Sequence, residues 1–208
     1  MLYDMSLKEF LKETASDRAA PGGGSVAALT GALASSLGAM VCNLTLGKEK
    51  YIAVQDEIKD LLHNLTANLE TLTKLIEDDA NAFNDVMDAF KMPKETEQQI
   101  EERKKAIQSG YKKAISVPNE TAKVTMNTLE LLEPILEKGN QNAITDAATG
   151  ALVAVAAIRG AILNIKINLT SINDEIYINT IKKEILELEQ KAMVTANRIL
   201  DKTNKLIG

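Results

Sequence analysis

The chain has 208 residues, of which 45% are hydrophobic, 25% are charged and only 3% are aromatic. This composition excludes an intrinsically disordered chain and disfavours an all-β fold, which usually depends on aromatic and β-branched side chains. The formal net charge of −5 disfavours nucleic acid as the main partner. The single cysteine excludes an internal disulfide and a thiolate metal cluster, and the single histidine disfavours a histidine-based zinc site.

The first predicted helix is short. Ser6 and Glu9 have the spacing of a capping box, which predicts a helix that begins after Ser6 and ends near Ala15. The segment before it has neither the basic start nor the apolar centre of a signal peptide, so we expect the protein in the cytoplasm.

The second predicted helix carries no charge. It follows a Pro-Gly-Gly-Gly turn at residues 21–24, with Ser25 as its N-cap, and runs to Leu46 before Gly47. Between Arg18 and Lys48 there are 29 uncharged residues, enough to span a bilayer. Because small residues dominate the stretch and a helix without a polar face is typically buried, we expect a helix enclosed by other helices and no membrane span.

The rest of the chain is predicted to be helical, with breaks at prolines and at Gly-Asn and Asn-Asp pairs. The expected helices cover residues 49–91, 96–116, 118–134, 142–169 and 174–205. Together with the first two, they predict an all-α fold in a single domain over residues 1–208: an antiparallel bundle of long helices around a buried small-residue helix. The uncharged surface of residues 25–46 and 147–158 exceeds what one bundle can bury, so we also predict a homodimer.

An acidic residue interrupts the apolar stripe of the long helix. The stripe reads Leu72, Ile76, Asp79, Phe83, Val86 and Phe90. A buried carboxylate is costly unless it is paired or used, and burial raises its pKa in a way that suits general acid–base catalysis. The alternative is a rotated helix with Asp79 at the rim of the core.

Three polar residues stand out in the apolar helix of residues 142–169. Asp146 and Asn164 are eighteen residues apart, so they share one face at about 27 Å along the axis, and Asn168 follows one turn later. These side chains either serve a site or crosslink helices in the core, and the spacing alone leaves both interpretations open.

The glycine-rich turn is a candidate anion site. Gly22, Gly23, Gly24 and Ser25 lead into a helix, whose first backbone N–H groups lie at the positive end of its dipole. The turn matches neither a Walker loop nor a dinucleotide fingerprint, so by itself it is weak evidence, and a flexible entry into a tightly packed helix explains it better than an anion site does.

Several separated segments, in order, resemble the cyclodeaminase/cyclohydrolase family of folate one-carbon enzymes. They are PGGGS at residues 21–25, MVCNLTLG at 40–47, DANAF at 79–83, MPK at 92–94, Val117-Pro118, Gly139-Asn140 with Asp146, and NIKINL at 164–169. The resemblance covers nearly the whole chain and implies an all-α dimer. A stand-alone methenyltetrahydrofolate cyclohydrolase fits better than a fused cyclodeaminase domain, because these 208 residues contain no formiminotransferase domain and the Cys42-Asn43 step resembles the stand-alone branch.

The resemblance implies hydrolysis of 5,10-methenyltetrahydrofolate to 10-formyltetrahydrofolate. The alternative activity is cyclodeamination of formiminotetrahydrofolate with release of ammonia. If the chain is not an enzyme, the alternative is a helical interaction protein. Neither reaction needs a metal or a cofactor beyond the tetrahydrofolate substrate, with or without a polyglutamate tail. We expect neither nucleic acid nor a membrane as partner.

The implied site has two catalytic candidates, Asp79 and Asp146. One of them would hold the amino-amide edge of the pterin through paired hydrogen bonds while the other handles water, and which does which stays open. The predicted substrate-binding residues are Gly22, Gly23, Gly24, Ser25, Asn43, Lys48, Phe83, Lys91, Lys94, Asn140, Asn164 and Asn168. Among them, the three lysines are candidates for contact with an anionic glutamate tail.

Overall fold

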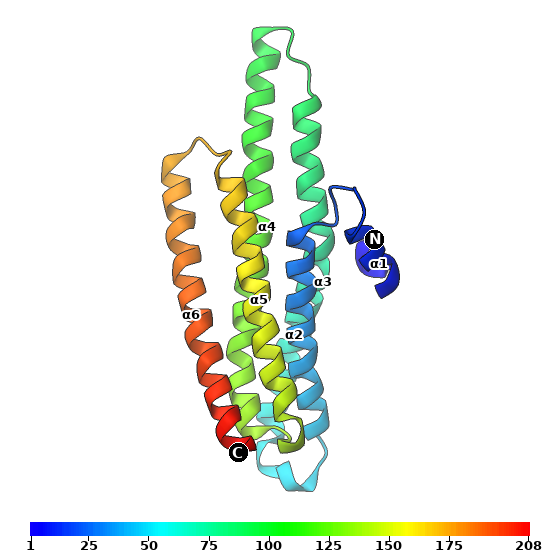
Figure 1. Cartoon of the computed structure of the whole chain (residues 1–208), viewed down its shortest axis with the longest axis vertical. Coiled ribbons are helices and arrows are strands. Elements are labelled where there is room, and N and C mark those ends of the chain that lie inside the picture. The colour runs from blue at the N-terminus through cyan, green and yellow to red at the C-terminus, as the bar shows by residue number, and fades with distance from the viewer.

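The computed structural model describes all residues, 1–208, as helices joined by short turns, with no β-strand (Figure 1). The α-helices are α1 (Leu7–Thr14), α2 (Gly23–Thr45), α3 (Gln55–Lys91), α4 (Glu97–Lys138), α5 (Ile144–Leu169) and α6 (Glu175–Ile207). Three short 3₁₀ helices, η1 (Leu2–Asp4), η2 (Glu49–Val54) and η3 (Gln141–Ala143), lie in the connections. The predicted all-α bundle is therefore confirmed.

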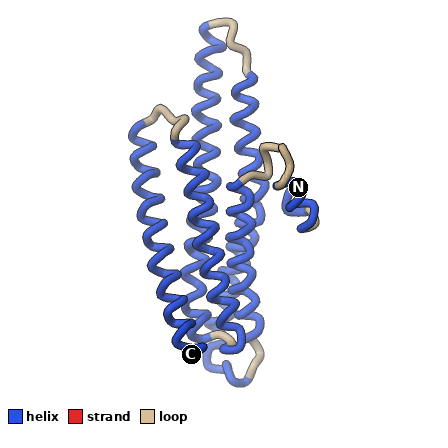
Figure 2. The backbone as a smooth tube through the Cα atoms, viewed as in Figure 1, coloured by secondary structure: helices blue, strands red, loops and turns tan.

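Five long helices form the bundle, and α1 lies beside it. Helix α2 packs against α3, α4 and α5, whereas α6 packs on α4 and α5 (Figure 1). The hairpin of α3 and α4 is longer than its neighbours, so its tip projects beyond the start of α2 and the end of α5 (Figure 2). This projection leaves an edge where the ends of the shorter helices meet the sides of the hairpin.

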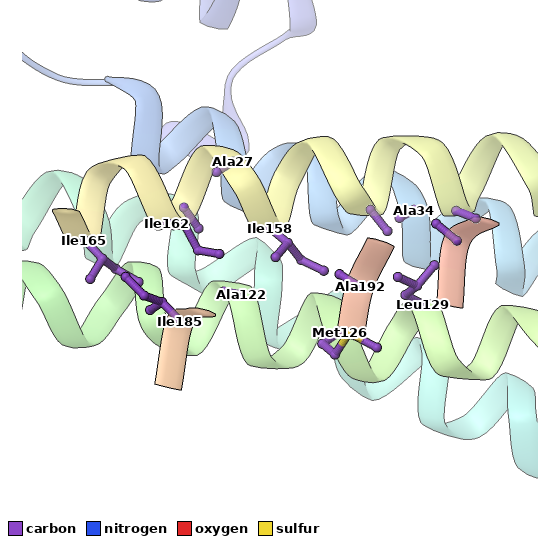
Figure 3. Close-up of a cluster of buried hydrophobic side chains, with 14 of the residues drawn as sticks. Ala27, Ala34, Ala122, Met126, Leu129, Ile158, Ile162, Ile165, Ile185 and Ala192 are labelled. Carbon is purple, nitrogen blue, oxygen red and sulfur yellow. The ribbon is translucent and has the colours of Figure 1, made fainter. Parts of the chain in front are cut away.

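Small residues bring α2 close to its neighbours, as predicted. A Cβ on Gly31 would overlap the Thr125 hydroxyl, and one on Gly38 would lie 2.8 Å from Leu132. Alanines such as Ala27 and Ala34 extend this packing into the largest core cluster, where larger side chains of α4, α5 and α6 fill the space (Figure 3). Close helix packing by small residues thus replaces the aromatic side chains that the composition lacks.

Two helices are long and apolar enough, by length and composition, to cross a membrane. They are α2 and the segment Gln141–Leu169, of which 56% and 50% of the apolar window is buried. Each packs against three other helices of the bundle and leaves its remaining side uncovered, so the expectation that other helices enclose α2 is met only in part. Helix α2 is not enclosed on every side, because Leu33, Met40 and Leu44 remain exposed.

The predicted break before Pro118 is wrong, because α4 continues through both Pro118 and Pro134. A proline inside a helix leaves the carbonyl four residues earlier without its N–H donor. For Pro118 that carbonyl belongs to Ala114, and the Asn168 side chain of α5 donates to it at 2.9 Å. A hydrogen bond from another helix therefore offsets the missing backbone bond.

Two further boundaries differ from the prediction. Residues 49–54 form the separate helix η2, in which Tyr51 has non-helical backbone angles, and the Gln55 side chain bonds the Tyr51 carbonyl at 2.9 Å. Ser25 is not the N-cap of α2, since Gly22 takes that position and the Ser25 side chain points to α3 instead. By contrast, the capping box of Ser6 and Glu9 is confirmed.

Candidate functional site

A cleft opens where the ends of α2 and α5 meet the sides of α3 and α4. Its volume is about 360 Å³, and its walls include seven of the predicted site residues: Gly22, Gly23, Gly24, Asp79, Phe83, Asn164 and Asn168. These residues come from three helices and are separated by up to 146 positions in the sequence. The fold thus assembles one half of the predicted site in a single place.

Asp79 lies in the wall of this cleft against the first turn of α2. Its Oδ2 accepts a hydrogen bond of 3.1 Å from the Ser25 hydroxyl. A Cβ on Gly24 would overlap Asp79 Oδ1 and lie 2.5 Å from Asp79 Cγ, so the carboxylate occupies the space that any other residue would need. Gly24 is therefore required here for close approach.

Burial raises the pKa of Asp79 above its ordinary value, whereas the hydroxyl and the backbone amide of Ser25 act in the opposite direction. The side chain is half-buried, so its exposure is intermediate between the core position and the rim position that the sequence left open. A carboxyl with a raised pKa, reachable from a cleft, can accept and return a proton near neutral pH more readily than an exposed aspartate.

Asn164 faces the same turn from α5. Its Nδ2 donates to the Gly160 carbonyl at 2.9 Å, and its amide lies 3.1 Å from the position that a Cβ on Gly23 would take. The Oδ1 atom has no hydrogen-bond partner in the structure, so it is free to accept one from a ligand or a water molecule in the cleft.

Asn168 has a structural bond as well as a place in the cleft. Its amide donates to the carbonyl that Pro118 leaves free, so it ties α5 to the one point where the backbone bonding of α4 is interrupted near the cleft. The sequence left open whether the two asparagines crosslink helices or serve a site. Asn168 crosslinks α5 and α4, whereas Asn164 keeps a free acceptor in the cleft.

An apolar ledge continues the cleft along the hairpin. Phe83, Met87 and Phe90 are 38%, 40% and 42% exposed, and Tyr111 of α4 meets Phe90 edge-on with ring centroids 6.3 Å apart. Phe83 and Phe90 belong to the stripe that the sequence predicts for the core, and Phe83 is also a predicted binding residue, whereas Met87 and Tyr111 are not among the predicted site residues. Met87 follows Phe83 by one helical turn, so its place could be read from the sequence, but Tyr111 belongs to α4 and no spacing from Asp79 indicates it. The projection of the hairpin beyond its neighbours leaves these side chains uncovered.

The remaining predicted residues near the connections lie at the opposite end of the bundle. Asn43 is exposed in the last turn of α2, and Lys48 is exposed after its end. Asp146 is half-buried in the first turn of α5 without a hydrogen bond or an ion pair. Asn140 is used structurally, since its Nδ2 donates to the Leu44 carbonyl at 3.0 Å and its Oδ1 accepts from the Asn142 amide at 3.1 Å. The structure does not bring this group together with Asp79.

The predicted lysines near the hairpin tip also lie outside the cleft. Lys91 pairs with Asp88 at 2.8 Å, and both side chains are more than 70% exposed. Lys94 is exposed in the turn between α3 and α4. Neither side chain is held towards the ledge.

No cluster of three or more metal-ligating side chains is present in the chain. The lone thiol, Cys42, is fully buried, and burial raises its pKa to about 11, so it stays protonated and unreactive at neutral pH. The chemistry that the cleft offers is therefore that of one carboxyl group, one free amide oxygen and an apolar ledge.

Comparison with known proteins gives consistent matches along nearly the whole chain. The family model described as formiminotransferase-cyclodeaminase matches residues 6–187. A methenyltetrahydrofolate cyclohydrolase of Methylorubrum extorquens is 37% identical over 201 residues, which cover 97% of both chains. The formimidoyltransferase-cyclodeaminase of Rattus norvegicus is 32% identical over 199 residues, and the match covers 96% of this chain but 37% of the rat protein.

A solved structure has the same fold. The formiminotetrahydrofolate cyclodeaminase of Thermotoga maritima superposes with a TM-score of 0.81 at 30% sequence identity, covering 99% of this chain and 97% of the other. The two full-length relatives thus carry the names of two different reactions.

Proposed function

The chain belongs to the formiminotransferase-cyclodeaminase family, and on that premise we propose that it is a methenyltetrahydrofolate cyclohydrolase. It would convert 5,10-methenyltetrahydrofolate and water to 10-formyltetrahydrofolate. The observation that carries the proposal is Asp79, a half-buried carboxyl with a raised pKa in the wall of the cleft. The other residues that line the cleft are uncharged.

Asp79 is proposed as the proton carrier. In its ionised form it accepts a proton from the water that adds to the amidinium carbon of the substrate, which forms a neutral tetrahedral intermediate. The protonated carboxyl then returns the proton to the pteridine nitrogen as the bond from that nitrogen to carbon breaks. The hydroxyl of the intermediate loses its proton to solvent as the formyl C=O forms, so one proton is released overall. Such positioned acid–base catalysis typically contributes about 10²–10⁴ in rate.

The cleft also favours the cationic substrate. The negative charge of Asp79 faces the developing reaction centre, while the walls contain no lysine or arginine that would repel an amidinium ion. The free Oδ1 of Asn164 can accept a hydrogen bond from the attacking water and so orient it. Asp146 lies about 27 Å from Asn164 along α5, so we assign it no step in this cleft.

Cyclodeamination remains the second candidate, because the Thermotoga maritima neighbour bears that name and the reaction moves protons around a similar tetrahedral carbon. The higher identity over full length with a cyclohydrolase supports our ranking of cyclohydrolase before cyclodeaminase.

Loss of methenyltetrahydrofolate absorbance and ammonia release from formiminotetrahydrofolate should be measured on one preparation, with and without chelator. Faster ammonia release would exchange the two activities, and turnover that chelation abolishes and one divalent ion restores would contradict our proposal of a metal-free, cofactor-free enzyme.

We expect Ser25→Ala to move the acidic limb of the pH–rate profile to higher pH. The Ser25 hydroxyl lowers the pKa of Asp79, so its removal raises that pKa further, and the ionised base is then lost at a higher pH as the solution is acidified. The measurement is kcat/KM against pH. Ser36→Ala is the control, since that hydroxyl bonds the Ala32 carbonyl of its own helix, and an equal displacement in both variants would contradict the assignment.

We also propose a homodimer formed through α2 and α5. The two helices lie side by side (Figure 1). Both expose apolar side chains, among them Met40 and Leu44 of α2 and Leu152 and Leu163 of α5. Arg159 lies in the same exposed stripe of α5 as Leu152 and Leu163, and its charge is paired with Glu189 of α6 at 3.0 Å. A largely apolar face that includes a single arginine of this kind is typical of an interface between subunits.

A charge in this face should dissociate the dimer. We expect Leu152→Glu to sediment as a monomer at micromolar concentration, because two copies of the new carboxylate would be buried without partners. Leu186→Glu is the matched control, since Leu186 is similarly exposed but lies on α6. A wild-type chain that sediments as an active monomer would overturn the homodimer.

We propose that residues 1–208 act as a single domain and that the protein works in the cytoplasm, where a soluble enzyme of folate metabolism meets its substrate.

A further inference from the structure

The ledge of the cleft ends at an arginine. On α3, Asp79, Phe83, Met87 and Phe90 follow one another at steps of four, four and three residues, which puts them on one face over about 16 Å. Arg103 of α4 lies at the far end of this row, with its guanidinium carbon 5.6 Å from the centroid of the Phe90 ring.

Two hydrogen bonds hold Arg103 in place. Its Nε and Nη2 donate to the Phe90 carbonyl at 3.3 Å and 3.0 Å, so the guanidinium is fixed to the end of the ledge. A guanidinium has five N–H donors, and those that remain, on Nη1 and on the outer side of Nη2, can bind a carboxylate in a second fork. Arg103 forms no ion pair with a carboxylate of the chain, unlike most of its neighbours.

The other cations of the hairpin are less suited to this role. Lys112 pairs with Asp174 at 2.9 Å, and Lys113 pairs with Asp85. Lys104 has no hydrogen bond or ion pair and is exposed, so no contact directs it to the ledge. Arg103 is thus the cation of the hairpin that is half-buried, oriented by contacts with a cleft residue and without an acidic partner.

We propose that Arg103 binds a carboxylate of the glutamate moiety of the substrate and so selects glutamylated folates. This inference rests on the proposed function. A tetrahydrofolate is an elongated molecule with the pterin at one end, an aminobenzoyl ring in the middle and carboxylates at the other. With the reactive end at Asp79, the ring lies along Phe83 and Met87, and the carboxylates reach Arg103. This assignment replaces Lys48, Lys91 and Lys94, the contacts that the sequence predicts for the tail.

The test compares two substrates in three proteins. Methenyltetrahydrofolate and methenyltetrahydropteroate, which lacks the glutamate, are assayed with the wild type, Arg103→Gln and Lys104→Gln. We expect Arg103→Gln to lower kcat/KM for the folate about 10- to 100-fold, mainly through KM, as for loss of a charge-assisted hydrogen bond, and to leave the pteroate unchanged. Lys104→Gln should stay within about threefold for both, as for an exposed charge. Arg103→Lys should lie between the wild type and Arg103→Gln, because it keeps the charge without the fork.

An equal loss on both substrates would overturn the proposal, because it would show that Arg103 only supports the end of α3. No loss on either substrate would overturn it as well. Calorimetric binding of 5-formyltetrahydrofolate and its pteroate counterpart separates this question from the proposed function. If the wild type binds the folate without turning over either reaction's substrate, the function fails while the binding difference still decides the role of Arg103. A wild type that binds neither compound would overturn both.

Discussion

Replacement of Asp79 by asparagine is expected to lower turnover at least about 10²-fold, the lower range for loss of an acid–base group. Asparagine has nearly the same shape and can still accept the hydrogen bond from Ser25, but it can neither carry a proton between water and nitrogen nor hold a negative charge. The loss should appear in kcat and in kcat/KM alike, because the interaction is made in the transition state.

The same variant should melt at the same temperature as the wild type or higher. Burial raises the pKa of Asp79 in the folded state, so ionising this group in place costs stability once the pH is above its unfolded pKa. Asparagine removes that cost. The advantage of the variant is therefore present at neutral pH, shrinks as the pH falls through the raised pKa and is absent below the unfolded pKa.

Turnover and melting temperature must be measured on one preparation. Asp78→Asn is the control, since Asp78 is the exposed neighbour on the same helix and should be nearly silent in both measurements. Near-normal turnover with a lowered melting temperature would assign Asp79 a structural role, and Asp146 would then become the leading candidate for catalysis.

The second large effect is expected from Gly24→Ala. The new Cβ would overlap Asp79 Oδ1, so either the carboxylate rotates out of its position or the start of α2 shifts. Because the obstacle is the end of a flexible side chain and alanine favours helix, we expect little change in melting temperature. Turnover should nevertheless fall about 10²-fold, since a displacement of about 1 Å at a catalytic group has that effect.

Gly22→Ala is the matched control for this variant. Its Cβ would lie 3.5 Å from the Ala19 carbonyl oxygen, an ordinary contact, although Gly22 lies in the same turn and in the same cleft. Its turnover should stay within about threefold of the wild type, as for a substitution that creates no clash. Equal losses in both glycine variants would show that the turn needs general flexibility and would contradict a specific contact between Gly24 and Asp79.

The sequence alone was sufficient for the helical fold and for the exceptional place of Asp79. Caps and turns act within a few residues, which is why the capping box at Ser6, the break at Gly47 and the start of α6 after Asp174 could be located without a structure. A carboxylate in an apolar stripe is equally visible, because the period of a helix is known in advance.

Tertiary structure decided everything that depends on contacts between distant segments. Helix α4 continues through Pro118, where Asn168, 50 residues later, bonds the freed carbonyl, and no local signal contains that partner. Asp146 was expected beside Asp79 in one site, yet the helices place it at the opposite end of the bundle from the cleft. Phe90 is exposed only because the hairpin outruns its neighbours. Local propensity determined which residues are helical, whereas packing between helices determined which side chains meet, because these contacts join residues far apart in the chain.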